Sequence, residues 1–204
     1  MGSKTWLAPL TGILSIIVLI VGFVLAGEPP DPTEEPVREI VDFYVDNESS
    51  VIVGSILQGI AGALVIFFGG YLFKTLRAAG AEASAVVTLA GAITFALGMA
   101  LDGTINFALA ETADDIEPDA VQALSALWHN DFLPFSMGLL VFLMGFGVSI
   151  VRHGVLPKWI GWVAIVASLT AISPAFFVGG IGAALLIVAS SVVFARRDRS
   201  TQAA

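Results

Sequence analysis

The sequence predicts an all-α membrane protein, a polytopic bundle of six transmembrane helices with two short amphipathic helices on its extracytoplasmic side. Of the 204 residues, 57% are hydrophobic and only 13% are charged, whereas a soluble domain is usually about 25% charged. The hydrophobic residues also gather in long runs that short polar segments separate, which is typical of helices that cross a bilayer. We therefore expect one integral membrane domain over residues 1–204.

The apolar runs define the expected spans, because about 20 apolar residues cross the hydrocarbon core as a helix. The run over 159–195 is too long for one span, and Pro174 divides it. The first run follows Lys4 and is longer than the hydrophobic part of a typical signal peptide, so we interpret it as a retained span. The expected spans are residues 6–26, 51–73, 83–110, 132–151, 159–173 and 175–195.

Two polar segments between spans carry apolar residues at helical spacing. Glu35-Pro36 precedes the stretch from Val37 to Val45, and Glu117-Pro118 precedes the stretch from Val121 to Trp128. We expect both to form short helices that lie parallel to the membrane over the outer mouth of the bundle. Their likeness leaves open a duplicated two-span unit; the alternative is that helix starts share this chemistry by convergence.

The basic residues predict the orientation, because Lys and Arg in short loops stay on the cytoplasmic side. With six spans, all of them except Arg38 fall on one side: Lys4, Lys74, Arg77, Arg152, Lys158, Arg196, Arg197 and Arg199. Most acidic residues fall on the other side. We expect a multi-pass protein of the inner (plasma) membrane with both termini in the cytoplasm.

Asp102 is the one formally charged side chain well inside an apolar run, and an ionisable residue in hydrocarbon is a candidate for function. Asn106 lies one helical turn further along, and Gln58 lies at a similar depth in its own span. These three side chains could line one polar cleft that binds a proton, a cation or a small molecule. The alternative is that Asp102 forms a packing hydrogen bond with a neighbouring helix.

His129 and Asp131 lie at the outer mouth of the span over 132–151 and are further candidates for ligand binding or proton relay with Asp102. A chain with no cysteine and one histidine on this side makes a poor metal site. We therefore expect no metal and no other cofactor. The alternative is that Asn130 or Asp131 caps the following helix, with His129 among the lipid headgroups.

The motifs exclude several classes of function. There is no phosphate-binding glycine loop, no HExxH or GxSxG motif and no lysine inside a span for a retinal Schiff base. The leading hypothesis is a small carrier-like protein, and the alternative is a non-catalytic interaction subunit. An intramembrane enzyme that uses Asp102, His129 and Asp131 ranks third, so an enzyme is not expected. The expected partners are the lipid bilayer and a second copy or another membrane protein, and not nucleic acid.

Four short motifs are found along the chain: Trp6 to Gly12 at the start, Tyr44-x-Asp46-Asn47 after the first acidic loop, Asn130-Asp131-Phe132-x-Pro134, and Gly154 to Trp162. With them the layout resembles a family of small bacterial six-span integral membrane proteins of unknown function. The resemblance covers most of the chain. It implies the fold and leaves activity, substrate and partners open.

Overall fold

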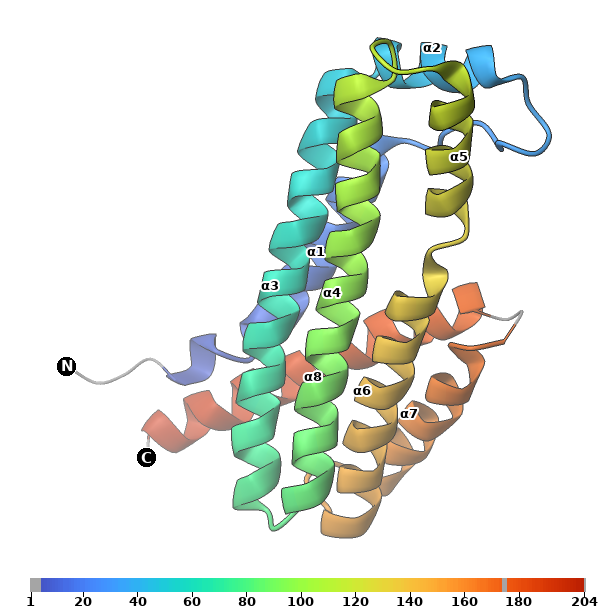
Figure 1. Cartoon of the computed structure of the whole chain (residues 1–204). Helices are drawn as coiled ribbons and strands as arrows, with labels where there is room; N and C mark the ends of the chain where they lie inside the picture. The colour runs from blue at the N-terminus through green and yellow to red at the C-terminus, as the bar shows by residue number, and fades with distance from the viewer. Residues whose placement is uncertain (1–4, 174–175, 204) are drawn as a thin grey trace.

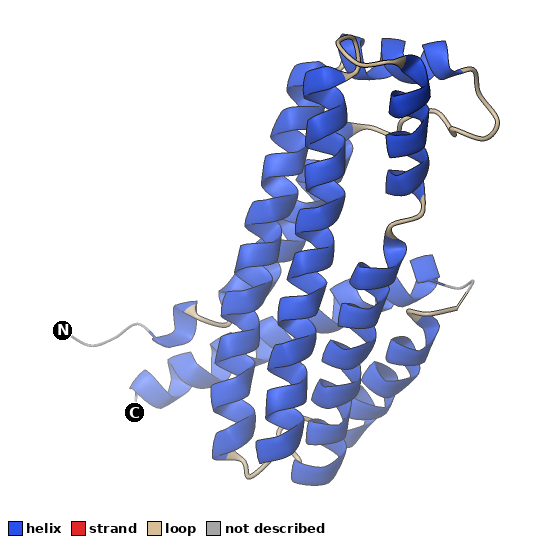
Figure 2. Ribbon diagram, viewed as in Figure 1, coloured by secondary structure: helices blue, strands red, loops and turns tan. Residues whose placement is uncertain are grey.

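The computed structural model describes residues 5–173 and 176–203, and every regular element in these residues is a helix (Figure 2). A short 3-10 turn, η1 (Thr5–Leu7), precedes the first α-helix. The α-helices are α1 (Leu10–Ala26), α2 (Val37–Asp46), α3 (Glu48–Ala78), α4 (Glu82–Thr112), α5 (Pro118–His129), α6 (Phe132–His153), α7 (Lys158–Thr170) and α8 (Phe176–Ala203). Pro174, which is expected to separate the last two spans, lies outside the described residues.

Four helical segments of the described chain are long and apolar enough to cross a membrane. They are Glu48–Ala78, Glu82–Thr112, the consecutive α5 and α6 over Pro118–His153, and Val178–Ser200. The helices α1 and α7 are apolar but have only 17 and 13 residues, or about 26 and 20 Å against a hydrocarbon core of about 30 Å. The chain therefore forms a helical membrane bundle, and the expected number of six spans is not confirmed.

The helix α5 departs from the sequence expectation. We expected it to lie flat on the membrane, but it runs beside the outer half of α4 and leads into α6, with only Asn130 and Asp131 between them (Figure 1). The reason is its apolar face: Val121 and Leu124 belong to the same cluster as Leu109 of α4, so this face is buried against protein. The helix α2, in contrast, lies across the end of the bundle (Figure 1). The different orientations remove the support for a duplicated unit.

Glycines bring α4 and α6 into backbone contact. A Cβ added to Gly98 would lie 2.6 Å from the backbone nitrogen of Phe135, and one added to Gly145 would lie 2.7 Å from that of Thr88. The other two close pairs are Gly91 with Phe142 and Gly138 with Phe95. The contacts advance by alternate steps of three and four residues along both antiparallel helices, as in a coiled coil. We call this contact the glycine seam.

The apolar core consists of two clusters. The larger, inner cluster includes Phe68, Phe142 and Phe146, and the smaller, outer cluster joins Ile40 and Tyr44 of α2 to α3, α4 and α5. Each helix that contributes to both clusters changes from one to the other over a few residues. On α3 the change falls between Val51 and Ala61, and on α4 between Met99 and Ile105. Gln58 and Asp102 lie in these two intervals.

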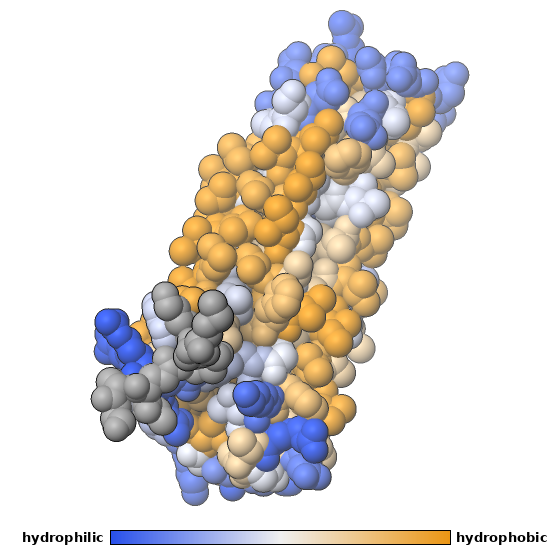
Figure 3. Space-filling view, turned by 90° about the vertical axis from the view of Figure 1, so that its left-hand side faces the viewer, coloured by the Kyte–Doolittle hydropathy of each residue, from blue (hydrophilic) through white to orange (hydrophobic). Residues whose placement is uncertain are grey.

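The end of the molecule opposite α2 carries the described basic residues predicted to be cytoplasmic. The loop from α3 to α4, the loop from α6 to α7 and the end of α8 meet there (Figure 1). Arg197 donates a hydrogen bond to the Val155 carbonyl at 3.0 Å, and the Tyr71 hydroxyl donates to Asp198 at 3.1 Å. A broad apolar band separates the two polar ends on the face in Figure 3. This surface matches contact with a lipid bilayer.

Candidate functional site

Asp102 and Asp131 lie close to each other just beyond the outer end of the glycine seam. Beyond the pair of Gly98 and Phe135, a further step of four residues along α4 and back along α6 reaches these two carboxyl groups. Asp102 lies close to Asp131, to the Trp128 indole and to the Gln58 amide. The buried Oδ2 atom of Asp102 has no neighbour within the distance and angle limits of a hydrogen bond. Asp102 therefore faces the interior of the bundle rather than lipid.

Asp131 precedes α6 but does not cap it. It stands at the N-cap position without a side-chain capping hydrogen bond, and the side-chain nitrogen of Asn130 donates to the Ala126 carbonyl at 2.8 Å, back into α5. The expectation that one of these two residues caps the helix is therefore wrong. The Oδ2 atom of Asp131 is buried and accepts no hydrogen bond.

Gln58 is the most deeply buried member of the group. It is 1% exposed, and neither its amide nitrogen nor its amide oxygen has a hydrogen-bond partner. A Cβ at Gly103 would lie 3.2 Å from the amide oxygen of Gln58, so the glycine next to Asp102 makes room for this side chain. A buried amide is normally paired, and each unpaired group costs about 1–3 kcal/mol.

Gln58 belongs to a larger set. In the described part of the chain, seven residues carry the buried side-chain nitrogen and oxygen atoms without a hydrogen-bond partner: Ser55, Gln58, Asp102, Ser125, Trp128, Asp131 and Ser136. All of them lie on α3, α4 and the α5–α6 segment where the two apolar clusters meet. We call this set the polar layer. Buried polar groups without partners require an explanation, and binding of an ion or a proton is one.

Asn106 does not join Asp102. Its Oδ1 atom accepts a hydrogen bond of 2.9 Å from the hydroxyl of Tyr44, and both side chains are buried. Burial, together with the nearby Asp102 carboxyl, raises the pKa of Tyr44 above its usual range, so the phenol stays neutral and donates. This bond ties α2 to α4, a role that the sequence did not suggest.

His129 also points away from Asp102. Its Nε2 atom lies 3.6 Å from Oδ2 of Asp31, in the segment before α2. The hydroxyl and backbone N–H of Thr33 donate to Asp31 at 2.7 and 2.8 Å and lower the pKa of that carboxyl. The proposed trio of Asp102, His129 and Asp131 is therefore not assembled. No group of three or more His, Cys, Asp or Glu side chains that could hold a metal occurs among the described residues.

Trp128 is the member of the site that the sequence did not reveal. We expected it at the end of a short helix on the membrane surface, but its indole nitrogen is buried near Asp102. Trp128 packs against the outer apolar cluster, to which Ile105 of α4 belongs. This contact becomes visible only when the packing of α5 against α4 is known.

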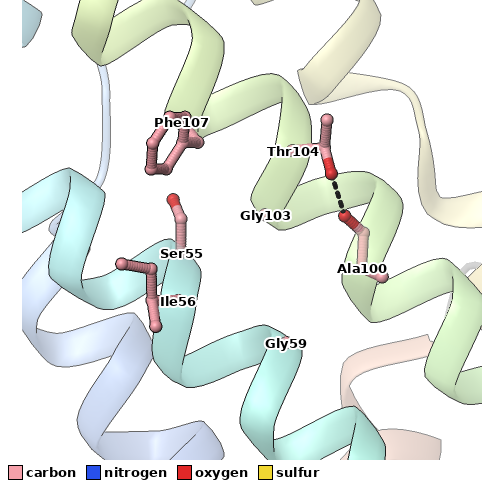
Figure 4. A pocket seen from close by; sticks show the side chains of 7 residues that line it. All are labelled: Ser55, Ile56, Gly59, Ala100, Gly103, Thr104 and Phe107. Carbon is pink, nitrogen blue, oxygen red and sulfur yellow. Dashed lines mark hydrogen bonds between the residues drawn. The ribbon is translucent and has the colours of Figure 1, made fainter.

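A hollow of about 230 Å³ lies between α3 and α4 at the level of the polar layer (Figure 4). Its lining residues are Ser55, Ile56, Gly59, Ala100, Gly103, Thr104 and Phe107. The Thr104 hydroxyl is satisfied by the Ala100 carbonyl at 2.6 Å, whereas the Ser55 hydroxyl has no partner. The hollow is apolar and open, and Asp102 and Gln58 are not among its lining residues.

Comparison with protein families gives one match. Residues 7–196 match the family described as Domain of unknown function (DUF4386). The chain belongs to this family. No curated protein and no solved structure matches the chain. The family's description assigns no activity, which agrees with the resemblance to an uncharacterised family and leaves the polar layer of this DUF4386 protein as the basis for a functional proposal.

Proposed function

We propose that this DUF4386 protein is a small carrier-like protein of the bacterial inner membrane that binds a cationic solute at the polar layer. The observation that carries the proposal is the Gln58 amide, 1% exposed and without a partner, close to Asp102 in the interior. Carboxyl groups attract a cation, and the nearby indole of Trp128 can add cation–π attraction.

The proposed topology has six spans, with both termini in the cytoplasm and α2 outside. The gathering of the basic residues at the end opposite α2 supports it. The short helices α1 and α7 then cross with help from their flanking segments and from local thinning of the bilayer. Single cysteines at Glu48 and Asp119 should react with an impermeant thiol reagent in intact cells, and one at Ala79 should not. Labelling of Ala79 from outside would reverse the orientation.

A non-catalytic interaction subunit is the second candidate. The hollow between α3 and α4 favours it, because the exposed Gly59 leaves open space there, and small residues let helices approach closely in lipid. In that case Gly59→Leu, which fills the hollow, should release a co-purifying partner or dissociate an oligomer. Under the carrier proposal the same variant should keep its transport activity.

The carrier proposal is tested with the full-length protein in proteoliposomes. Uptake of radiolabelled choline and of tetraethylammonium, as cationic probes, is compared between wild type, Asp102→Asn and Asp46→Asn. Asp102→Asn keeps the shape of the side chain but cannot ionise, so uptake should fall at least tenfold. Asp46→Asn changes an exposed acid and should have no effect. Equal uptake by wild type and Asp102→Asn, or by protein-free liposomes, would remove the carrier function.

A further inference from the structure

The inference concerns the two carboxyl groups at the outer end of the glycine seam, and it rests on the proposed function. We propose that Asp102 and Asp131 hold one proton between them, and that this proton is the coupling ion which the transported cation displaces. The pair would thus make the protein a cation/proton exchanger.

The first support is the absence of any counter-charge. The groups that face Asp102 are Gln58 from α3, Tyr44 from α2, and Trp128 and Asp131 from the α5–α6 segment. None is basic. In the described residues neither carboxyl forms an ion pair, and His129, the nearest basic side chain in sequence, is turned towards Asp31. The Oδ2 atom of each carboxyl is buried. Two neighbouring, partly buried carboxylates without a cation repel each other and lose hydration, so one of them keeps a proton.

The second support is the chemistry of the neighbouring groups. The indole of Trp128 can only donate a hydrogen bond, and the Gln58 amide can both donate and accept. A pair with one proton presents one negative charge for the indole and amide N–H groups, and one hydroxyl for the amide oxygen. Three atoms of these side chains have no hydrogen-bond partner: Trp128 Nε1, Gln58 Nε2 and Gln58 Oε1. Their two donors and one acceptor match a carboxyl pair that holds one proton. A divalent metal, in contrast, would have only two carboxyl groups and one amide oxygen, short of the six or more oxygen ligands it usually takes.

The third support is the position of the pair. Asp131 stands at the two-residue break between α5 and α6, where the helix hydrogen-bond ladder is interrupted. A small rotation of α5 would change its distance from Asp102 without disturbing the glycine seam below. When a cation binds between the carboxyl groups, the O–H bond of the protonated one breaks and the proton passes to water, so the net charge of the occupied site is unchanged.

Infrared spectroscopy of the full-length protein in lipid tests the proposal, because a protonated carboxyl has its own carbonyl band. At neutral pH wild type should show one protonated carboxyl per chain, and Asp102→Asn and Asp131→Asn should each lose it. Asp46→Asn should keep it. The wild-type band should also persist when Na⁺ or K⁺ replaces the bulky cation N-methylglucamine. Only variants with the helicity and the gel-filtration elution volume of wild type are compared, which shows that they are folded. If Asp102→Asn does not fold, Asp131→Asn at the helix break provides the test.

Two results would overturn the shared proton: no protonated carboxyl in wild type, or a band that both single variants retain. A band that Na⁺ or K⁺ abolishes would instead make a metal ion the displacing cation and overturn exchange with an organic cation. These outcomes are separate from a failure of transport. Loss of choline uptake with the band intact would leave the proton pair standing and remove the carrier, and uptake without the band would do the reverse.

Discussion

The inner and outer halves of α4 meet the α5–α6 segment in opposite ways. In the inner half, a glycine on one helix faces a larger residue on the other at each described contact, from Thr88 with Gly145 to Gly98 with Phe135. In the outer half the register continues to Asp102 and Asp131, where neither residue is glycine and the partner helix breaks. Backbone contact therefore fixes the inner half, while polar side chains separate the helices in the outer half.

Hydrogen bonding shows the same contrast. In the inner half the Ser149 hydroxyl lies 2.8 Å from both the Gly145 carbonyl and the Ser84 hydroxyl, and Thr88 donates to the Ser84 carbonyl at 2.8 Å. The polar layer of the outer half has no such partners. Departures from local packing rules concentrate at functional sites in natural proteins. The inner half therefore serves as the scaffold, and the outer half contains the candidate site.

The largest change in the free energy of unfolding is expected when a methyl group is added in the glycine seam. In Gly138→Ala the new Cβ would meet the backbone of Phe95, so the helices must separate, and the free energy of unfolding should fall by about 3 kcal/mol. Gly59→Ala is the matched control, because a Cβ there meets nothing within 4 Å, and it should leave stability unchanged or raise it by up to about 1 kcal/mol. Unfolding of both variants in detergent is the measurement. Similar losses in the two variants would refute the seam as the scaffold.

A smaller effect is expected at the contact that holds α2 over the polar layer. Tyr44→Phe removes the donor to Asn106 and leaves a buried acceptor unpaired, at a cost of about 1–2 kcal/mol. In Asn106→Leu the hydroxyl of Tyr44 loses its acceptor in turn. The double variant should therefore be less destabilised than the sum of the two single variants, in the same unfolding assay. Additive losses would mean that the two side chains do not interact.

The sequence predicted the long apolar helices well and their packing partners poorly, and the six expected spans are not confirmed. Residues 51–73 and 83–110 fall within α3 and α4, because hydrophobicity over about 20 residues is a local property. The orientation of α5 was not predicted, because its apolar face can be buried either against lipid headgroups or against protein residues such as Leu109. The sequence of the helix does not distinguish these two surroundings.

The candidate site was predicted in part for the same reason. Asp102 and Gln58 were placed together from their depths in the spans, and the structure brings them close. Asn106 and His129 have partners in the segment around α2, Tyr44 and Asp31, which are distant in the chain. Trp128 joins the layer only through the packing of α5 against α4. Such contacts depend on tertiary packing, which no periodicity within one helix reveals.

The smallest effect is expected at the outer rim, outside the polar layer. Hydrogen bonds from Thr33 lower the pKa of Asp31, so this carboxylate stabilises the loop before α2 above the unfolded-state pKa of about 4. The contribution is lost as the pH falls through the folded-state pKa. In Thr33→Val the pKa of Asp31 should rise towards its ordinary value, which NMR titration of the carboxyl carbon measures. An unchanged titration would show that Thr33 does not hold this carboxylate.

The most direct test of the account is whether Asp102 faces Asp131 across the end of the glycine seam. The chain has no native cysteine, so the pairs Asp102→Cys with Asp131→Cys, and Leu101→Cys with Asp131→Cys, can be oxidised in membranes without background. Leu101 is 44% exposed and serves as the control on another face of α4. The account predicts a disulfide within one chain for the pair 102–131 and none for 101–131. A disulfide between 101 and 131, with none between 102 and 131, would contradict it.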